Sequence, residues 1–189
     1  GFQVIIGAVV KGVLLVSVSL LFGALIPTIT VMLFFASLRL IAGGYHMDTY
    51  GKCITVSLAL FVLAGVIVQY THIYWPGEYI MVLAVATFVA GLYAVIRWAP
   101  KDTPNKPITR PEDIKKFKIL SIAHIFVWIG VEFALMYMKL NMYALAGCFG
   151  IMISIFIISP PGHRFFDMLS GRMDRAKKLK MNLTAGKNL

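Results

Sequence analysis

Six long apolar segments dominate this chain and limit its possible folds more than any other feature. They cover residues 2–22, 24–42, 53–70, 79–96, 119–138 and 140–159. An α-helix needs about 17–25 residues of this kind to cross a bilayer. Lipid offers no partners to backbone N–H and C=O groups, so a spanning segment satisfies them itself, as a helix does. We therefore expect an all-α integral membrane protein, a bundle of about six transmembrane helices forming a single polytopic domain over residues 1–189.

The composition and the placement of charge agree with a membrane protein. Hydrophobic residues make up 59% and charged residues 14% of the chain, against about 45–50% and about 25% in soluble domains. The net charge is +10, but the basic residues gather mainly in residues 97–118 and 164–187. The positive-inside rule then places loops 43–52 and 97–118 and both termini in the cytoplasm. The basic tail, 160–189, is expected to bind anionic lipid headgroups rather than nucleic acid.

Prolines interrupt the chain before the fifth apolar segment and after the sixth. Segment 97–118 contains four prolines, which favour an extended, turn-rich connection. Its last part, RPEDIKKFK, has acids before bases, as is typical of a helix start. Pro160-Pro161 should end the sixth crossing. Beyond it we predict a short surface helix from His163, with four interfacial side chains: Phe165, Phe166, Met168 and Leu169.

Two charged residues, Lys11 and Glu132, fall within apolar segments. Charges inside a membrane are costly and usually face the bundle interior or water. Two interpretations stay open. The two side chains could form a pair or a polar contact for a peptide substrate, or Lys11 could simply extend its amine to the interface.

The stretch RLIAGGYHMDTYGKC, residues 39–53, contains the most chemically suggestive residues. His46 and Cys53 are seven residues apart, a rise of about 10.5 Å on a continuous helix. A nucleophile and its base need to be about 2.6–3.2 Å apart. Gly43, Gly44 and the sequence MDTYG favour a break in the helix, so a turn could bring His46 back to Cys53. A histidine that is only interfacial is the simpler alternative.

Cys53 begins an apolar segment, which places it in the first turn of a predicted helix. Free backbone amides and the positive end of the helix dipole lie there, and both favour a thiolate. Lys52 and a protonated His46 would act in the same direction, and the amides could also stabilise an oxyanion. Cys148, inside the sixth segment, is expected only to pack. His46 and Cys53 lack the third and fourth ligands that zinc requires, so we expect neither a metal nor a cofactor.

The motif resembles that of the accessory gene regulator B (AgrB) family of membrane cysteine endopeptidases. The matching residues are Arg39, Gly43, Gly44, Tyr45, His46 and Cys53, and Ala99-Pro100 with Asn105 to Ile108 resemble the family's second polar loop. The resemblance implies a multi-pass protein of the bacterial plasma membrane that acts in quorum sensing as a homodimer, with its catalytic loop on the cytoplasmic side. It also implies a partner, an AgrD-type precursor peptide with an acidic C-terminal tail.

The resemblance further implies a role for each motif residue. Cys53 would attack the precursor, release its tail and hold the remainder as a thioester, which an internal cysteine of the precursor converts to a thiolactone. His46 would be the base and then the acid. Arg39 would brace the 43–52 loop or hold precursor carboxylates. Asp48 or Thr49 would orient the imidazole, and Lys52 would supply positive charge.

Other interpretations of the same residues remain. Family members carry a cytoplasmic stretch before the first crossing, whereas this sequence is apolar from Phe2 onward. A small membrane transporter or peptide-binding protein would use His46 and Cys53 only for packing, although the paired glycine-interrupted half-helices typical of transporters are not evident. A lipid-modifying enzyme would need a further carboxylate beside Asp48.

Overall fold

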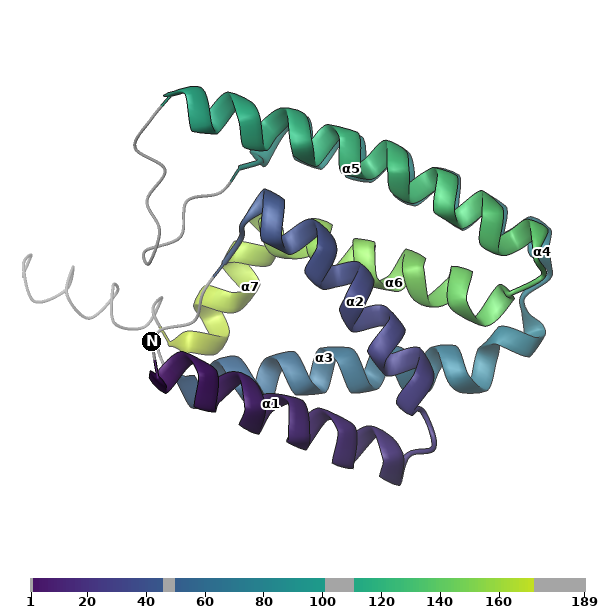
Figure 1. Cartoon of the computed structure of the whole chain (residues 1–189), viewed down its shortest axis with the longest axis horizontal. Helices are drawn as coiled ribbons and strands as arrows, with labels where there is room; N and C mark the ends of the chain where they lie inside the picture. Colours follow the sequence, from purple (N-terminus) through teal and green to yellow (C-terminus); the bar gives the residue numbers. More distant parts are fainter. Residues whose placement is uncertain (1, 46–49, 101–110, 172–189) are drawn as a thin grey trace, which may run out of the picture.

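The computed structural model describes residues 2–45, 50–100 and 111–171, and all the regular structure in these ranges is helical (Figure 1). The helices are α1 (Phe2–Leu21), α2 (Leu25–Ala42), α3 (Tyr50–Thr71), the 3-10 turn η1 (His72–Tyr74), α4 (Gly77–Trp98), α5 (Pro111–Tyr137), α6 (Asn141–Ile158) and α7 (Pro160–Ser170). The predicted all-α class is confirmed.

Five of the described segments are long and apolar enough to cross a membrane. They are Leu25–Ala42, Gly51–Tyr74, Gly77–Trp98, Glu112–Tyr137 and Asn141–Ile158. Helix α1 adds a shorter apolar segment, Val9–Leu21. Large apolar side chains such as Val13, Val89 and Phe126 are exposed on these helices, as expected for surfaces that face lipid.

Helices α2 and α6 form the centre of the bundle. Helix α2 packs against α6, α3 and α5, helix α4 packs against α5 and α6, and α1 packs mainly against α3 (Figure 1). The core around α2 and α6 includes Leu38, Trp128, Ile151 and Cys148, all buried. Cys148 is thus a packing residue, as expected from its surroundings in the sequence.

Glycines allow the central helices to approach closely. A Cβ added at Gly150 of α6 would lie 2.6 Å from the carbonyl oxygen of Val31 and 2.8 Å from Phe34 Cβ on α2. A Cβ at Gly65 of α3 would lie 2.7 Å from Thr28 Cα, also on α2. Small residues at such points are the usual means of close helix packing in membranes. They fix how near α3 and α6 come to α2, and therefore the width of the space between them.

Three helices begin at least three residues before the start predicted from the sequence: α3, α5 and α7. Helix α3 begins at Tyr50 rather than 53, because Tyr50–Lys52 are part of its first turn. Helix α5 begins at Pro111, followed by Glu112 and Asp113 in its first turn, so the PEDIKKFK part of this segment, residues 111–118, is helical as predicted. Proline suits the first helical position because the amide it lacks has no intrahelical partner there.

Helix α7 begins at Pro160, three residues before the predicted start. Ser159 is its N-cap, and the Ser159 hydroxyl accepts a hydrogen bond of 3.2 Å from the Gly162 amide. The two prolines therefore end one helix and start the next. The expectation that Phe166 contacts the membrane interface was wrong: its side chain is 4% exposed and packs inward, whereas Met168 is 61% exposed.

Candidate active site

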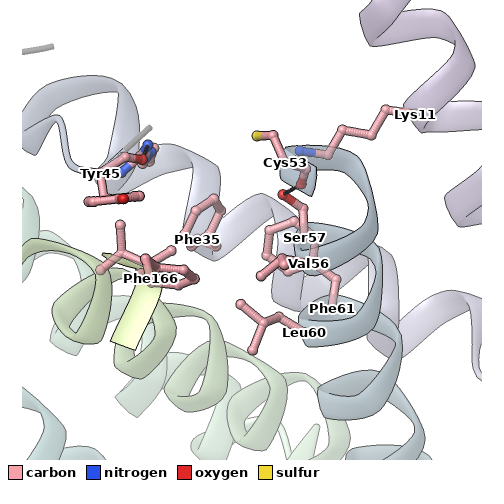
Figure 2. Close-up of a pocket in the computed structure, with 11 residues that line it drawn as sticks. Lys11, Phe35, Tyr45, Cys53, Val56, Ser57, Leu60, Phe61 and Phe166 are labelled. Atoms are coloured by element: carbon pink, nitrogen blue, oxygen red, sulfur yellow. Dashed lines mark hydrogen bonds between the residues drawn. The ribbon is translucent and has the colours of Figure 1, made fainter. Parts of the chain in front are cut away.

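Cys53 is the fourth residue of α3 and is half-buried. It completes the first turn of α3, and the helical residues that precede it have backbone amides without a partner inside the helix. Its carbonyl oxygen accepts a hydrogen bond of 2.6 Å from the Ser57 hydroxyl one turn later. The thiol faces a cavity that opens between α1, α2, α3 and α7 (Figure 2).

This cavity has a volume of about 230 Å³ and combines two kinds of lining. Lys11, Arg39, Tyr45, Cys53 and Ser57 supply its polar groups. The remaining lining is apolar and comes from α2, α3, α6 and α7: Phe35, Val56, Leu60, Phe61, Ile157 and Phe166. The Cys53 thiol therefore lies where cationic groups meet an apolar surface.

Arg39 ties the end of α2 to the chain that follows it. Its Nη1 donates a hydrogen bond of 3.2 Å to the Gly43 carbonyl, and its Nη2 donates to the Tyr45 carbonyl. Of the two roles expected for Arg39, bracing the loop is the one that these hydrogen bonds favour. The planar guanidinium of arginine holds its N–H donors in fixed directions. It therefore suits two neighbouring carbonyl groups better than the ammonium group of a lysine would.

The paired glycines make room for this brace. Gly43 has φ +71° and Gly44 has φ +139°, both on the side of the map that L-residues rarely occupy. A Cβ on Gly44 would also lie 1.8 Å from Arg39 Nη1. The Gly-Gly pair is therefore needed both for its backbone conformation and for the space beside Arg39. From the sequence the pair was predicted only to break the helix.

The Tyr45 side chain contacts α7. Its hydroxyl donates a hydrogen bond of 2.7 Å to Asp167 Oδ1. Its ring stacks on Phe166, with centroids 5.4 Å apart, and meets the His163 ring edge-on at 5.3 Å. Sequence reasoning gave α7 no part in the site. No local pattern could have shown it, because these contacts join residues more than a hundred positions apart.

Lys11 does not pair with Glu132. The Lys11 side chain runs from α1 towards Cys53 (Figure 2), its Nζ lies 5.8 Å from the centre of the Phe61 ring, and it lines the cavity. Glu132 is fully buried on α5, close to Gly147 of α6. Lys11 and Arg39 both line the cavity that Cys53 faces.

The structure thus brings Arg39 and Cys53 to one cavity, with Gly43 and Gly44 next to the Arg39 guanidinium. Lys52 is exposed and lies outside the cavity lining. His46, Asp48 and Thr49 lie outside the described residues, so the predicted dyad stays a prediction. Within residues 2–45, 50–100 and 111–171, no three His, Cys, Asp or Glu side chains gather as a metal site would require.

These features define a class of protein: a multi-pass helical membrane protein with a cysteine that opens into a cationic, apolar-floored cavity. The model of the family Accessory gene regulator B (AgrB) matches residues 1–158, and the chain belongs to this family. Membership gives it a part in the processing step of Agr quorum sensing, with an AgrD-type peptide as the general class of substrate.

Relatives in two genera support the assignment. An AgrB-like protein of Listeria innocua is 28% identical over 155 residues, which cover 82% of this chain and 73% of that protein. An AgrB-like protein of Clostridium perfringens is 30% identical over 115 residues, which cover 59% of this chain and 54% of that protein. No solved structure matches the chain.

Proposed function

We propose that this protein is a cysteine endopeptidase that removes the C-terminal tail of an AgrD-type precursor and promotes closure of a thiolactone ring. The observation that carries the proposal is the exposure of the Cys53 thiol to a cavity with positive charge and an apolar floor. Cys148 offers a contrast, since it is buried in the hydrophobic core.

In the first step the Cys53 thiolate attacks the carbonyl carbon at the scissile bond. The tetrahedral intermediate carries a negative charge on oxygen, which free amides of the first α3 turn could stabilise. The C–N bond then breaks, and His46, having taken the thiol proton, gives a proton to the leaving amine. The tail departs, and the rest of the precursor remains as a thioester on Cys53.

In the second step a cysteine inside the precursor loses its proton to His46 and attacks the thioester carbonyl. The Cys53–acyl bond breaks, and the products are a cyclic thiolactone and a regenerated Cys53. This exchange replaces one thioester by another, so it needs no energy source of its own. Water would divert the intermediate to a linear acid, and the apolar cavity wall disfavours water beside the thioester.

The remaining parts of the proposal concern placement. The basic segments support a cytoplasmic position for the Cys53 end of α3, by the positive-inside rule, and a newly made precursor would be available there. Positive charge at that side attracts an acidic tail and speeds encounter. As the family resemblance implies, the working form is a homodimer associated with anionic lipid.

An intact-mass assay in liposomes tests this function. The probe is the AgrD-type precursor encoded nearest to the gene for this chain. Wild type should release the tail and show a transient mass adduct. Cys53→Ala should abolish both while still binding the peptide, and His46→Ala should slow adduct formation. Cys148→Ala, which removes the other thiol, should still form the adduct.

The same assay separates the proposal from its main alternative. A transporter or peptide-binding protein would bind the precursor and leave it intact in wild type and Cys53→Ala alike. That result, obtained with peptide demonstrably bound, would overturn the peptidase assignment.

A further inference from the structure

The cavity beside Cys53 contains two positively charged side chains. Its lining includes Lys11 and Arg39, and none of the described residues that line it is Asp or Glu. Two cations without an acid in a partly apolar space favour an anionic ligand, because attraction is stronger where water is scarce. The two cations differ in how far their donors are already engaged.

Arg39 is occupied with the protein itself. Its two terminal nitrogens donate to the Gly43 and Tyr45 carbonyls. Those bonds set the course of the chain after α2, so redirecting the guanidinium to a ligand would release the loop. Arg39 therefore contributes charge to the cavity more readily than it contributes a hydrogen bond.

Lys11 is engaged differently. Its Nζ makes no hydrogen bond or ion pair with the part of the chain that the structure describes, and its recorded contact is the face of Phe61, at 5.8 Å. A cation–π contact leaves the ammonium hydrogens that point away from the ring available to an acceptor. A lysine in an apolar helix normally extends to the interface. Here the extended side chain reaches the wall of the Cys53 cavity (Figure 2).

The size of the cavity limits what it holds. Pockets that enclose a drug-sized ligand have volumes of about 300–1,000 Å³, whereas this one has about 230 Å³. Only a small part of a peptide fits, such as one apolar side chain against Leu60 and Phe61 with a polar group near Lys11. The ligand is thus a short stretch of peptide in which an apolar group and an anion lie close together.

We propose that Lys11 of α1 binds a carboxylate of the substrate's acidic tail and thereby sets the peptide in register with Cys53. The proposal rests on the proposed function and adds a specificity residue to it. In the bound peptide the carboxylate accepts hydrogen bonds from Lys11 Nζ, and the neighbouring apolar side chain packs on the cavity floor. The lysine acts on binding and register, and the bond-breaking step stays with Cys53.

Binding measurements in the Cys53→Ala background test this without any chemistry. The probe is the fluorescently labelled precursor, together with a set in which each tail Asp or Glu is replaced singly by Asn or Gln. In nanodiscs, Lys11→Met should weaken the acidic precursor about tenfold, and Lys11→Arg should keep most of the affinity. Lys139→Met, which changes a lysine in the α5–α6 connection outside the cavity lining, should change nothing.

The amide series identifies the carboxylate. One substituted peptide should bind equally weakly to the protein that retains Lys11 and to the Lys11→Met variant, because the partner of Lys11 is already gone. If Lys11→Met weakens every peptide by the same factor, the lysine acts through packing and the proposal fails. It also fails if Lys11→Met leaves the affinity for the unmodified precursor unchanged.

Turnover by the protein with Cys53 intact is measured separately. If the precursor is cleaved but Lys11→Met and the amide substitutions show no energetic coupling in binding, this inference is refuted and the peptidase proposal stands. If Lys11 and a tail carboxylate are coupled in binding but the precursor is not cleaved, the peptidase proposal is refuted and the site binds an acidic peptide.

Discussion

Tyr45 and Asp167 are 122 positions apart, yet the Tyr45 hydroxyl donates a hydrogen bond of 2.7 Å to Asp167 Oδ1. This bond attaches the chain just before His46 to α7, the helix that follows the last membrane-crossing segment. Phe166, the neighbour of Asp167, stacks on the same tyrosine ring and lines the Cys53 cavity. Helix α7 is therefore a structural wall of the candidate site.

Breaking this bond should impair the site more than the fold. Tyr45→Phe keeps the ring contacts and removes the hydroxyl, at a cost of about 1 kcal/mol in unfolding free energy. We expect turnover to fall several-fold, because the Gly43–Tyr45 chain loses one of its attachments. Asp167→Asn removes the acceptor charge, and the double variant should lose no more than the worse single one. Additive losses, measured as kcat/KM, would show that the two residues act independently.

Arg39→Lys should behave as a severe substitution despite keeping the charge. A lysine ammonium cannot donate in a fixed fork to the Gly43 and Tyr45 carbonyls, so the loop loses its brace. We expect kcat/KM to fall at least about tenfold, which is about 1.4 kcal/mol. The variant should still insert and bind the precursor. Wild-type turnover in Arg39→Lys would mean that only the charge matters.

Gly150→Ala should destabilise the bundle. The added methyl would lie 2.6 Å from the Val31 carbonyl oxygen and 2.8 Å from Phe34 Cβ, so α2 and α6 have to separate. We expect a loss of about 1–3 kcal/mol in thermal or denaturant unfolding in detergent.

Gly130→Ala is the matched control for that change. Apart from its chain neighbours and the backbone of its own helix, nothing lies within 4 Å of the position that its Cβ would take. Alanine there should be neutral or stabilise the helix by up to about 1 kcal/mol. Equal losses at Gly130 and Gly150 would contradict the close packing of α2 and α6.

Phe166→Ala should widen the Cys53 cavity and loosen α7. Its ring is 4% exposed and contacts Tyr45, Phe156 and Phe165, so its removal should cost about 3 kcal/mol. Met168→Ala, on the exposed side of the same helix, should cost much less. Tail release and unfolding temperature, measured in parallel, check both effects. A harmless Phe166→Ala would argue against α7 as a wall of the site.

Local sequence signals predicted most of the elements. The apolar segments gave the helices of the bundle, Pro160-Pro161 marked the change from α6 to the next helix, and the acids after Pro111 marked the start of α5. The boundary of α3 was misplaced because Tyr50–Lys52 are too polar for a membrane span, although they still form a helical turn. Apolar content indicates which residues are buried in lipid, and it indicates helix formation only indirectly.

The candidate site was predicted unevenly. The motif from Arg39 to Cys53 drew attention because glycine, histidine and cysteine have distinctive conformations and chemistry. Lys11 was left between two interpretations, and Phe166 was assigned to the membrane interface. Both depend on how α1 packs against α3 and α7 against α6, and nothing near either residue encodes that packing. Glu132 was considered as a partner for Lys11, and the structure places the two in different environments.

The sequence by itself determined that this chain is a helical membrane protein of the AgrB family and that Cys53 lies at the start of a helix. Hydrophobic length, proline placement and motif spacing are local properties, and they carry that information directly. Only the tertiary structure decided that Lys11, Arg39, Tyr45 and Phe166 surround the thiol. Their convergence arises from close glycine-mediated packing of α2, α3 and α6 and from the return of α7 onto Tyr45, which join residues that are distant in the sequence.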